Sequence, residues 1–293
     1  MTATYNGVGG GAQGKLTKVR RGLFRRYPTM VIGGALLVVM VVGAVFAPFL
    51  FTTDPIILNP IDRLIPPGNR FWFGTDMFGR DIYSRTVYGA RISLAVGLFA
   101  ALLSVVIGLL IGLVSGYVRL IDKIAMRVMD GLMAIPGILL AIALVSLSGA
   151  NLVTVIVAIT IPEIPRVVRL VRSIVLSVRE EPYVEAAIAS GTRLPQILVR
   201  HVLPNTIPPL IVQATYVCAS AMLTEAILGF LGAGTPPEIP SWGNIMAEGR
   251  TYFQLAPWII IFPGLALAVT VLAVNVLGDG LRDTLDPRIA KKM

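Results

Sequence analysis

The sequence predicts an all-α membrane protein with six transmembrane helices and both termini in the cytoplasm. Three observations support this fold class. Of the 293 residues, 55% are hydrophobic and only 14% are charged, whereas ordinary soluble domains contain about 25% charged residues; the mean hydropathy is +0.80. Five long stretches contain no charged residue. Lysine and arginine are also divided unevenly among the segments that connect those stretches.

Each uncharged stretch is long enough for the roughly 20 apolar residues that a helix needs to cross a bilayer. The stretches cover residues 27–53, 92–118, 131–162, 202–224 and 251–278. The third has 32 residues, too many for one ordinary crossing, and residues 146–151 near its middle are typical of a turn. We therefore expect two helices there, at about 132–147 and 152–172, and six crossings in all.

The second of these two helices would continue to Arg166, Arg169 and Arg172. These arginines recur every third residue, so they share one face of the helix. Long basic side chains on such a face can reach lipid headgroups or meet protein at the membrane surface.

The orientation follows from counting basic residues. With six crossings, 19 of the 25 Lys and Arg residues fall on the side that holds both termini, and six fall on the other side. Because basic residues accumulate on the cytoplasmic side of a membrane protein, the side with 19 is predicted to be cytoplasmic. A five-crossing arrangement would lose this asymmetry.

The domain organisation follows from this topology. We expect a flexible basic cytoplasmic tail that can contact anionic lipid, a first transmembrane helix with an extracytoplasmic segment, a transmembrane core and a C-terminal cytoplasmic tail. Their ranges are 1–29, 30–88, 89–279 and 280–293, and the core contains a long cytoplasmic loop at 173–205.

Several kinds of site are excluded by composition. One cysteine (Cys218) and one histidine (His201) rule out a disulfide scaffold and a Cys/His metal site built from this chain alone. Residues 9–15 match the start of a phosphate-binding loop, but Leu16 stands where Ser or Thr is needed and no strand precedes it. We therefore expect no catalytic, metal, cofactor or ATP site. The net charge of +9 is attributed to topology, not to nucleic-acid binding.

The cytoplasmic loop is predicted to begin with a helix of about two turns. Pro182 suits the first turn of a helix, and Glu180 and Glu181 suit its positive end. Gly191 suits a left-handed residue just past the last turn. This helix would lie on the cytoplasmic face of the membrane.

A second short helix is expected directly afterwards. Thr192 would cap it, and it would run through Arg200 before Leu203-Pro204 leads into the fifth crossing. Two short helices at an angle would form a rigid unit to which a soluble partner can bind.

The loop residues resemble a known family. Glu185-Ala186-Ala187, followed by Gly191 and Leu203-Pro204, are similar in spacing to the EAA loop of permease subunits in binding-protein-dependent ABC importers. Four further stretches resemble the second ("C-type") permease of the oligopeptide and dipeptide importers, and together the similarity covers about residues 30–288. Those stretches are 73–94, 116–137, 228–243 and 275–288.

The resemblance implies a type I ABC importer fold in the bacterial inner membrane. This subunit would pair with a sister permease subunit as a heterodimer, with two ATP-binding subunits on the cytoplasmic side and an extracytoplasmic substrate-binding protein outside. The subunit itself would be non-catalytic, and the EAA-loop residues would couple it to an ATPase. The implied cargo is a peptide; nickel chelates, glutathione, opines and oligosaccharides are the alternatives.

Three further residues are candidates for function. Glu225 is an acid within a crossing, so it is expected to line the pathway, to face the partner subunit or to bond to a neighbouring helix. Trp242 and Tyr252 lie in an extracytoplasmic segment and would dock the binding protein or pack over the partner. An ion-coupled secondary transporter is the main rival class, but such folds usually contain internal repeats, and none is evident here.

Overall fold

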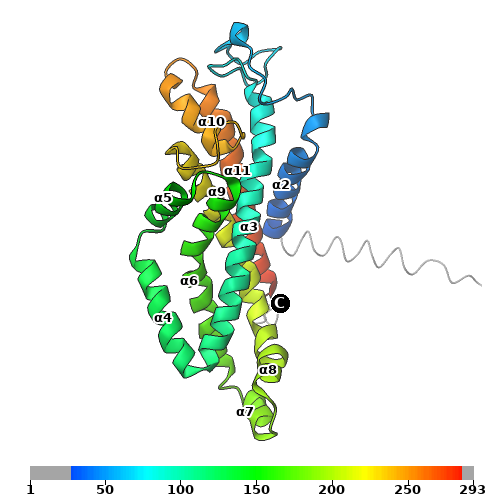
Figure 1. The fold of residues 1–293 in the computed structure, drawn as a ribbon. Helices are drawn as coiled ribbons and strands as arrows, with labels where there is room; N and C mark the ends of the chain where they lie inside the picture. The colour runs from blue at the N-terminus through cyan, green and yellow to red at the C-terminus, as the bar shows by residue number, and fades with distance from the viewer. Residues whose placement is uncertain (1–27, 286–293) are drawn as a thin grey trace, which may run out of the picture.

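The computed structural model describes residues 28–285, and within them the chain is helical apart from its connecting segments (Figure 1). Predictions that fall on residues 1–27 and 286–293 lie outside the described residues. The long helices are α2 (Pro28–Val45), α3 (Ile82–Tyr117), α4 (Arg119–Ala134), α5 (Gly137–Ser148), α6 (Leu152–Val178), α9 (Leu203–Phe230) and α11 (Trp258–Leu285). The shorter elements are η1 (Ala47–Phe49), η2 (Pro60–Asp62), α7 (Pro182–Ala189), α8 (Leu194–Ile197), the π-helix η3 (Leu198–Val202), α10 (Trp242–Gly249) and η4 (Arg250–Tyr252).

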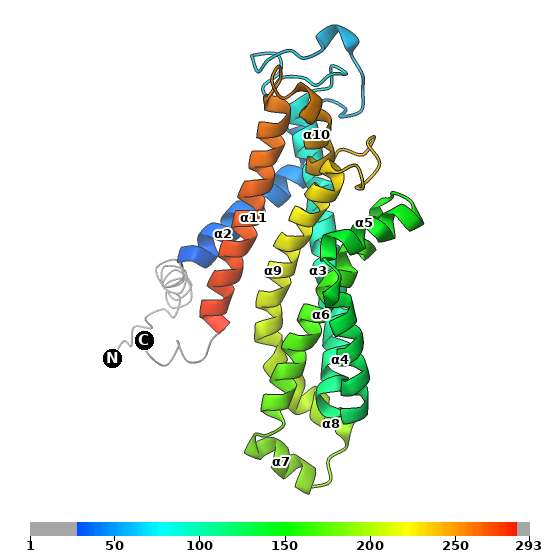
Figure 2. The same cartoon turned by 90° about the vertical axis from the view of Figure 1, so that its left-hand side faces the viewer.

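Helix α3 runs through the centre of the bundle and packs against α6 and α9 (Figures 1 and 2). Its contact with α6 is unusually close, because a Cβ added at each of three α3 glycines would lie 2.5–2.6 Å from a valine Cβ of α6. Small residues spaced by four allow membrane helices to approach in this way. The pairs are Gly108 with Val167, Gly112 with Val171 and Gly116 with Val175.

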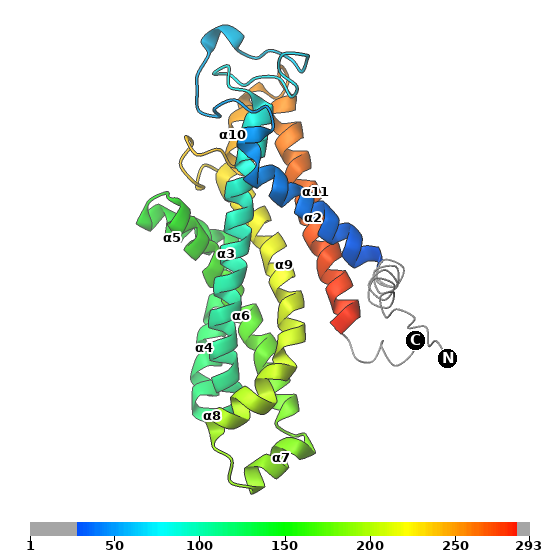
Figure 3. The same cartoon turned by 90° about the vertical axis from the view of Figure 1, so that its right-hand side faces the viewer.

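Helix α2 lies along α11 at the side of the bundle (Figure 3). Here too glycine allows the approach, since a Cβ at Gly33 would lie 2.5 Å from the backbone nitrogen of Leu277. The far side of α2 is apolar and exposed: Ile32, Val38 and Val39 are each more than half accessible. Such a surface suits lipid or another apolar helix.

The predicted helix at 132–147 is wrong in its bounds. The chain instead forms α4 and α5, which meet at an angle of 89°. Ile135 and Pro136 are extended at the junction, because a proline disfavours helical geometry in the residue before it and has no N–H to continue the helix. The turn predicted near 146–151 is confirmed: Gly149 has φ +83°, and the Asn151 side chain accepts from the Thr154 N–H at the start of α6.

Four helices within the described residues are long and apolar enough to cross a membrane, or five if α4 and α5 together form one bent crossing. They are α2, α3, the continuous α8–α9 segment and α11. Helix α6 is long enough, but it carries Glu163, Arg166, Arg169 and Arg172.

Helices α3 and α11 differ in length from the uncharged stretches that indicated them. Helix α3 begins at Ile82, ten residues before the uncharged stretch, because Asp81 caps it by accepting from the Ser84 N–H at 2.9 Å. Helix α11 continues to Leu285, so the first residues of the predicted tail 280–293 are helical. In both cases the helix extends past the uncharged stretch that marked it.

Candidate functional site

The segment that we call the elbow (residues 182–202) forms the lower tip of the molecule in Figures 1 to 3. Pro182 lies in the first turn of α7, and Gly191 follows the helix with φ +75°, as predicted. The N–H of Gly191 donates to the Ile188 carbonyl at 2.9 Å, and that of Thr192 donates to the Ala187 carbonyl at 3.1 Å. These two bonds form the Schellman motif that ends a helix on a left-handed residue.

The prediction that Thr192 caps the second short helix is wrong. Arg193 occupies the N-cap position of α8, without a side-chain hydrogen bond, and Thr192 instead belongs to the end of α7, where its N–H donates to Ala187. The second helix also does not end at Arg200. It continues through η3 directly into α9, with Pro204 in the first turn of α9.

One side chain anchors α7 to the bundle. Val184 is fully buried and belongs to an apolar cluster that also contains Ile197 of α8, four valines of α6, and Leu210 and Val217 of α9. The remainder of the helix is open: Glu185, Ala186 and Ile188 are exposed, and Ala187 is half-buried. A surface of this kind, supported from behind and uncovered in front, can be contacted by another protein.

A polar contact joins the elbow to the start of α9. The Asn205 amide nitrogen donates to the Tyr183 hydroxyl at 3.2 Å and to the His201 carbonyl at 2.7 Å. Leu203 is half-buried and Pro204 is exposed beside them. The EAA-loop residues therefore occupy one continuous end of the molecule, from α7 to the first turn of α9.

The opposite end carries the apical segment (residues 46–81), which is held by a buried ionic network. Asp76 accepts from Arg80 at 2.5 Å and from Arg85 at 2.8 Å, and both arginines also donate to Glu248 of α10. The side chains of Arg85 and Asp76 are each only 1% exposed. Buried charges require this kind of mutual pairing, and removal of one partner is costly.

The structure does not support Trp242 as a docking residue. Its side chain is fully buried, and its indole N–H donates to the Thr86 carbonyl at 3.0 Å. Tyr252 is half-buried beside Ile259 and Phe262. The apolar side chains exposed at this end were not singled out by sequence reasoning, which could not separate them from buried ones. They include Phe49, Phe51, Ile57, Ile61, Phe253 and Leu255.

Glu225 is also fully buried, so its carboxylate lines no open surface in this conformation. The Ser93 hydroxyl of α3 donates to one carboxylate oxygen at 3.0 Å. The other oxygen has no hydrogen-bond partner within the described residues. Of the three expectations for Glu225, the bond to a neighbouring helix is the one that the structure contains.

The three arginines of α6 contact protein. Arg169 pairs with Asp130 at 2.6 Å, and Arg172 pairs with Asp122, so two ion pairs join α6 to α4. Arg166 instead pairs with Glu163 of its own helix at 3.3 Å. Sequence reasoning overlooked Glu163, although its position within a predicted crossing was a signal that could have identified it.

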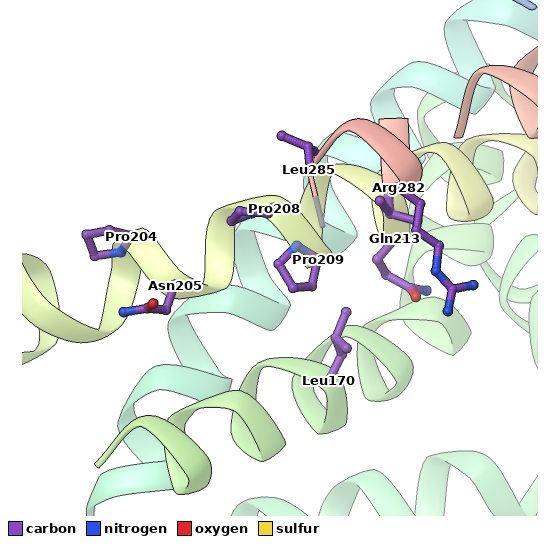
Figure 4. A pocket seen from close by; sticks show the side chains of 9 residues that line it. Leu170, Pro204, Asn205, Pro208, Pro209, Gln213, Arg282 and Leu285 are labelled. Atoms are coloured by element: carbon purple, nitrogen blue, oxygen red, sulfur yellow. The ribbon is translucent and has the colours of Figure 1, made fainter. Parts of the chain in front are cut away.

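A groove of about 540 Å³ lies between α6, α9 and α11, next to the elbow (Figure 4). Its walls combine apolar and polar side chains, with the Arg282 guanidinium at one side. The lining residues are Leu170, Pro204, Asn205, Pro208, Pro209, Val212, Gln213, Arg282 and Leu285. Within residues 28–285 no three His, Cys, Asp or Glu side chains are placed together to hold a metal.

The chain belongs to the family of binding-protein-dependent transport system inner membrane components. The family pattern matches residues 104–291. The protein is therefore a bacterial inner-membrane permease subunit of the ABC transporter class, which implies ATPase and binding-protein partners.

Relatives align along nearly the whole chain. A probable peptide ABC transporter permease protein, y4tQ, of Sinorhizobium fredii is 58% identical over 92% of both chains. The dipeptide transport system permease protein DppC of Alkalihalophilus pseudofirmus is 44% identical over 88% of this chain and 86% of its own. The glutathione transport system permease protein GsiD of Escherichia coli is 41% identical over 91% and 88%.

The fold is that of a type I importer permease. A chain of the MetNI methionine ABC transporter, solved in inward-facing conformations, has a TM-score of 0.58 with 21% sequence identity. The match covers 70% of this chain and 98% of the other.

Proposed function

We propose that this protein is one of two sister permease subunits in an ATP-driven importer of short peptides. The observation that carries the proposal is α7, a two-turn helix with an exposed front and a single buried anchor, Val184. Glu185, Ala186 and Ala187 lie on it, and Gly191 ends it. A helix presented in this way can sit in a groove of an ATPase and transmit its movement to the bundle.

The topology that fits this role has six crossings. They are α2, α3, the bent pair α4–α5, α6, α8–α9 and α11, with the elbow and both termini in the cytoplasm. The charges of α6 are compatible with a crossing because Arg169 and Arg172 are paired with α4 and Arg166 with Glu163. The distribution of basic residues favours the same orientation.

The proposed partners follow from the two ends of the molecule. Two ATP-binding subunits would hydrolyse ATP and engage the elbows of this chain and its sister, so the permease itself is non-catalytic. The substrate-binding protein would dock on the apical end, where Tyr252 is half-buried and apolar side chains such as Ile61 and Leu255 are exposed.

The names of the relatives support a peptide as cargo. Two of those reported above are described as peptide or dipeptide permeases and one as a glutathione permease. Glutathione is itself a modified tripeptide, so it is the second candidate. Rigid-body movement of the helices between inward-open and outward-open states would carry the cargo across.

The experiment uses the complete importer in proteoliposomes, with Gly191→Val compared with the unchanged protein. A β-branched residue at φ +75° disrupts the turn that ends α7, while a side chain there meets no atom within 4 Å. We expect insertion and assembly to persist, and peptide uptake driven by ATP to fall by about tenfold or more.

Gly232→Val is the matched control. Gly232 has φ +80°, has open space around its Cβ position and ends α9 in the same hydrogen-bonding pattern, but at the opposite end of that helix from the elbow. We expect this variant to retain uptake within about threefold. Normal uptake by Gly191→Val would contradict the coupling role, and uptake without ATP or binding protein would contradict the importer.

A further inference from the structure

Helix α9 carries a row of polar side chains that the proposed function does not yet use. Ser220, Tyr216, Gln213 and Asn205 are spaced so that they share one face of the helix. Tyr216 is 51% exposed although it lies halfway along the helix, and the other three are exposed or half-buried. We call this row, together with Glu163 and Arg166 of α6, the polar track.

The upper part of the track is an ion pair with one hydroxyl partner and one aromatic neighbour. The Ser220 hydroxyl donates to Glu163 at 3.0 Å, and Glu163 pairs with Arg166 at 3.3 Å. The Arg166 guanidinium lies 5.8 Å from the centre of the Tyr216 ring. The Glu163 side chain is 10% exposed and that of Arg166 is 47% exposed. Glu163 is therefore largely buried and paired, whereas the Arg166 guanidinium is accessible.

The lower part of the track enters the groove of Figure 4. Gln213 and Asn205 line this groove, and Arg282 of α11 faces it. Pro208 and Pro209 have no N–H, so the carbonyls of Pro204 and Asn205 lack their usual helical donors. The groove thus offers the side-chain amide oxygens of Gln213 and Asn205 as acceptors next to a cationic side chain.

An open arginine and an open tyrosine in the middle of a crossing are costly against lipid, so this face must meet water or protein. Two accessible guanidinium groups with neighbouring carbonyl acceptors suit a ligand that carries a carboxylate and N–H donors. A short peptide has both.

We propose that the polar track lines the route of the peptide through this subunit and that Arg166 contacts the carboxylate of the cargo. This inference rests on the proposed function. The track runs from the middle of α9 towards the elbow, so it ends beside the part of the chain that the ATPase would move.

The first test measures access of water. Cys218 is the only cysteine, so in a Cys218→Ala background Tyr216→Cys and Gln213→Cys are treated with a charged thiol reagent in the assembled importer in nanodiscs. Leu98→Cys, at an α3 position that is 61% exposed, is the control. We expect both track positions to react about tenfold faster than the control, because a thiolate forms poorly in apolar surroundings. Equal rates would overturn the proposal.

The second test measures transport. Arg169 has the same exposed fraction as Arg166, 47%, but pairs with Asp130 away from the track. We expect Arg166→Gln to lower peptide uptake per ATP hydrolysed by about fivefold, Arg166→Lys to restore most of it, and Arg169→Gln to change it by less than about twofold.

Recovery of uptake in a Glu163→Gln/Arg166→Gln double variant would assign the pair a structural role and overturn the proposal. So would normal uptake by Arg166→Gln alone. Both readouts require that the unchanged importer transports peptide with ATP and binding protein. If the unchanged importer does not transport peptide, the proposed function fails. The thiol test then still decides whether water reaches the polar track.

Discussion

The apical segment and the elbow contain glycines with almost the same backbone conformation in opposite surroundings. Gly79 has φ +76° and Gly191 has φ +75°. A Cβ at Gly79 would lie 1.7 Å from the Asn59 carbonyl oxygen, whereas a Cβ at Gly191 would have no atom within 4 Å. The same turn geometry is therefore enclosed at one end of the protein and open at the other.

The surrounding contacts differ in the same way. Three buried charged side chains and the partly exposed Glu248 hold the apical segment to α10, while one buried valine and one hydrogen bond to Tyr183 hold α7 to the bundle. Local stability rises with the number of buried contacts, so the two ends are expected to respond differently to substitution. A rigid apical surface is suited to docking of another protein. A helix with few buried contacts, such as α7, is suited to being bound and moved by a partner.

The largest expected effect is that of Arg85→Met. This change leaves Asp76 and Glu248 buried with Arg80 as their remaining partner, which costs about 3–5 kcal/mol. We expect poor accumulation in the membrane and a clearly lower Tm of the purified protein. Arg63→Met, at an exposed position of the same segment, is the control and should behave like the unchanged protein. Equal Tm values for the two variants would mean that the network does not hold the apical segment.

The next comparison places alanine at each of the two glycines. Gly79→Ala forces the Asn59 backbone to move in addition to straining φ, so it should cost about 3 kcal/mol. Gly191→Ala strains only φ and should cost about 1 kcal/mol. Thermal unfolding of both variants measures the difference. If the two variants unfold at the same temperature, the close backbone contact around Gly79 does not make the apical segment more sensitive than the elbow.

A smaller effect is expected from Val184→Ala. Removing two buried methyl groups should cost about 2 kcal/mol locally and loosen α7 without unfolding the bundle. Hydrogen exchange should therefore increase in residues 182–190 and remain unchanged in α3. Faster exchange throughout the chain would show that α7 is part of the main cooperative unit.

The smallest effect on stability is expected from Ile188→Ser. The side chain is 48% exposed, and exposed substitutions usually change stability by less than about 0.5 kcal/mol. If α7 docks on an ATPase, this variant should nevertheless bind that subunit more weakly in a pull-down from detergent. A lowered Tm with unchanged binding would show that Ile188 belongs to the core of the protein and not to the surface that contacts the ATPase.

The sequence by itself determined the features that depend on near neighbours. The helix start at Pro182, the left-handed turn at Gly191 and the turn before Asn151 each follow from the chemistry of a few adjacent residues. The family resemblance depended on the same kind of local pattern, and the match over residues 104–291 confirms it.

Other features were decided only by tertiary structure, because their partners are distant in the chain. Arg85 pairs with Glu248, 163 positions away, and the indole N–H of Trp242 donates to a carbonyl 156 positions away. Glu225 is likewise fully buried and accepts a hydrogen bond from Ser93 of α3. No local pattern distinguishes an aromatic or acidic side chain that will be buried from one that will be exposed. Burial is a property of the packed helices, since it depends on which surfaces they bring together.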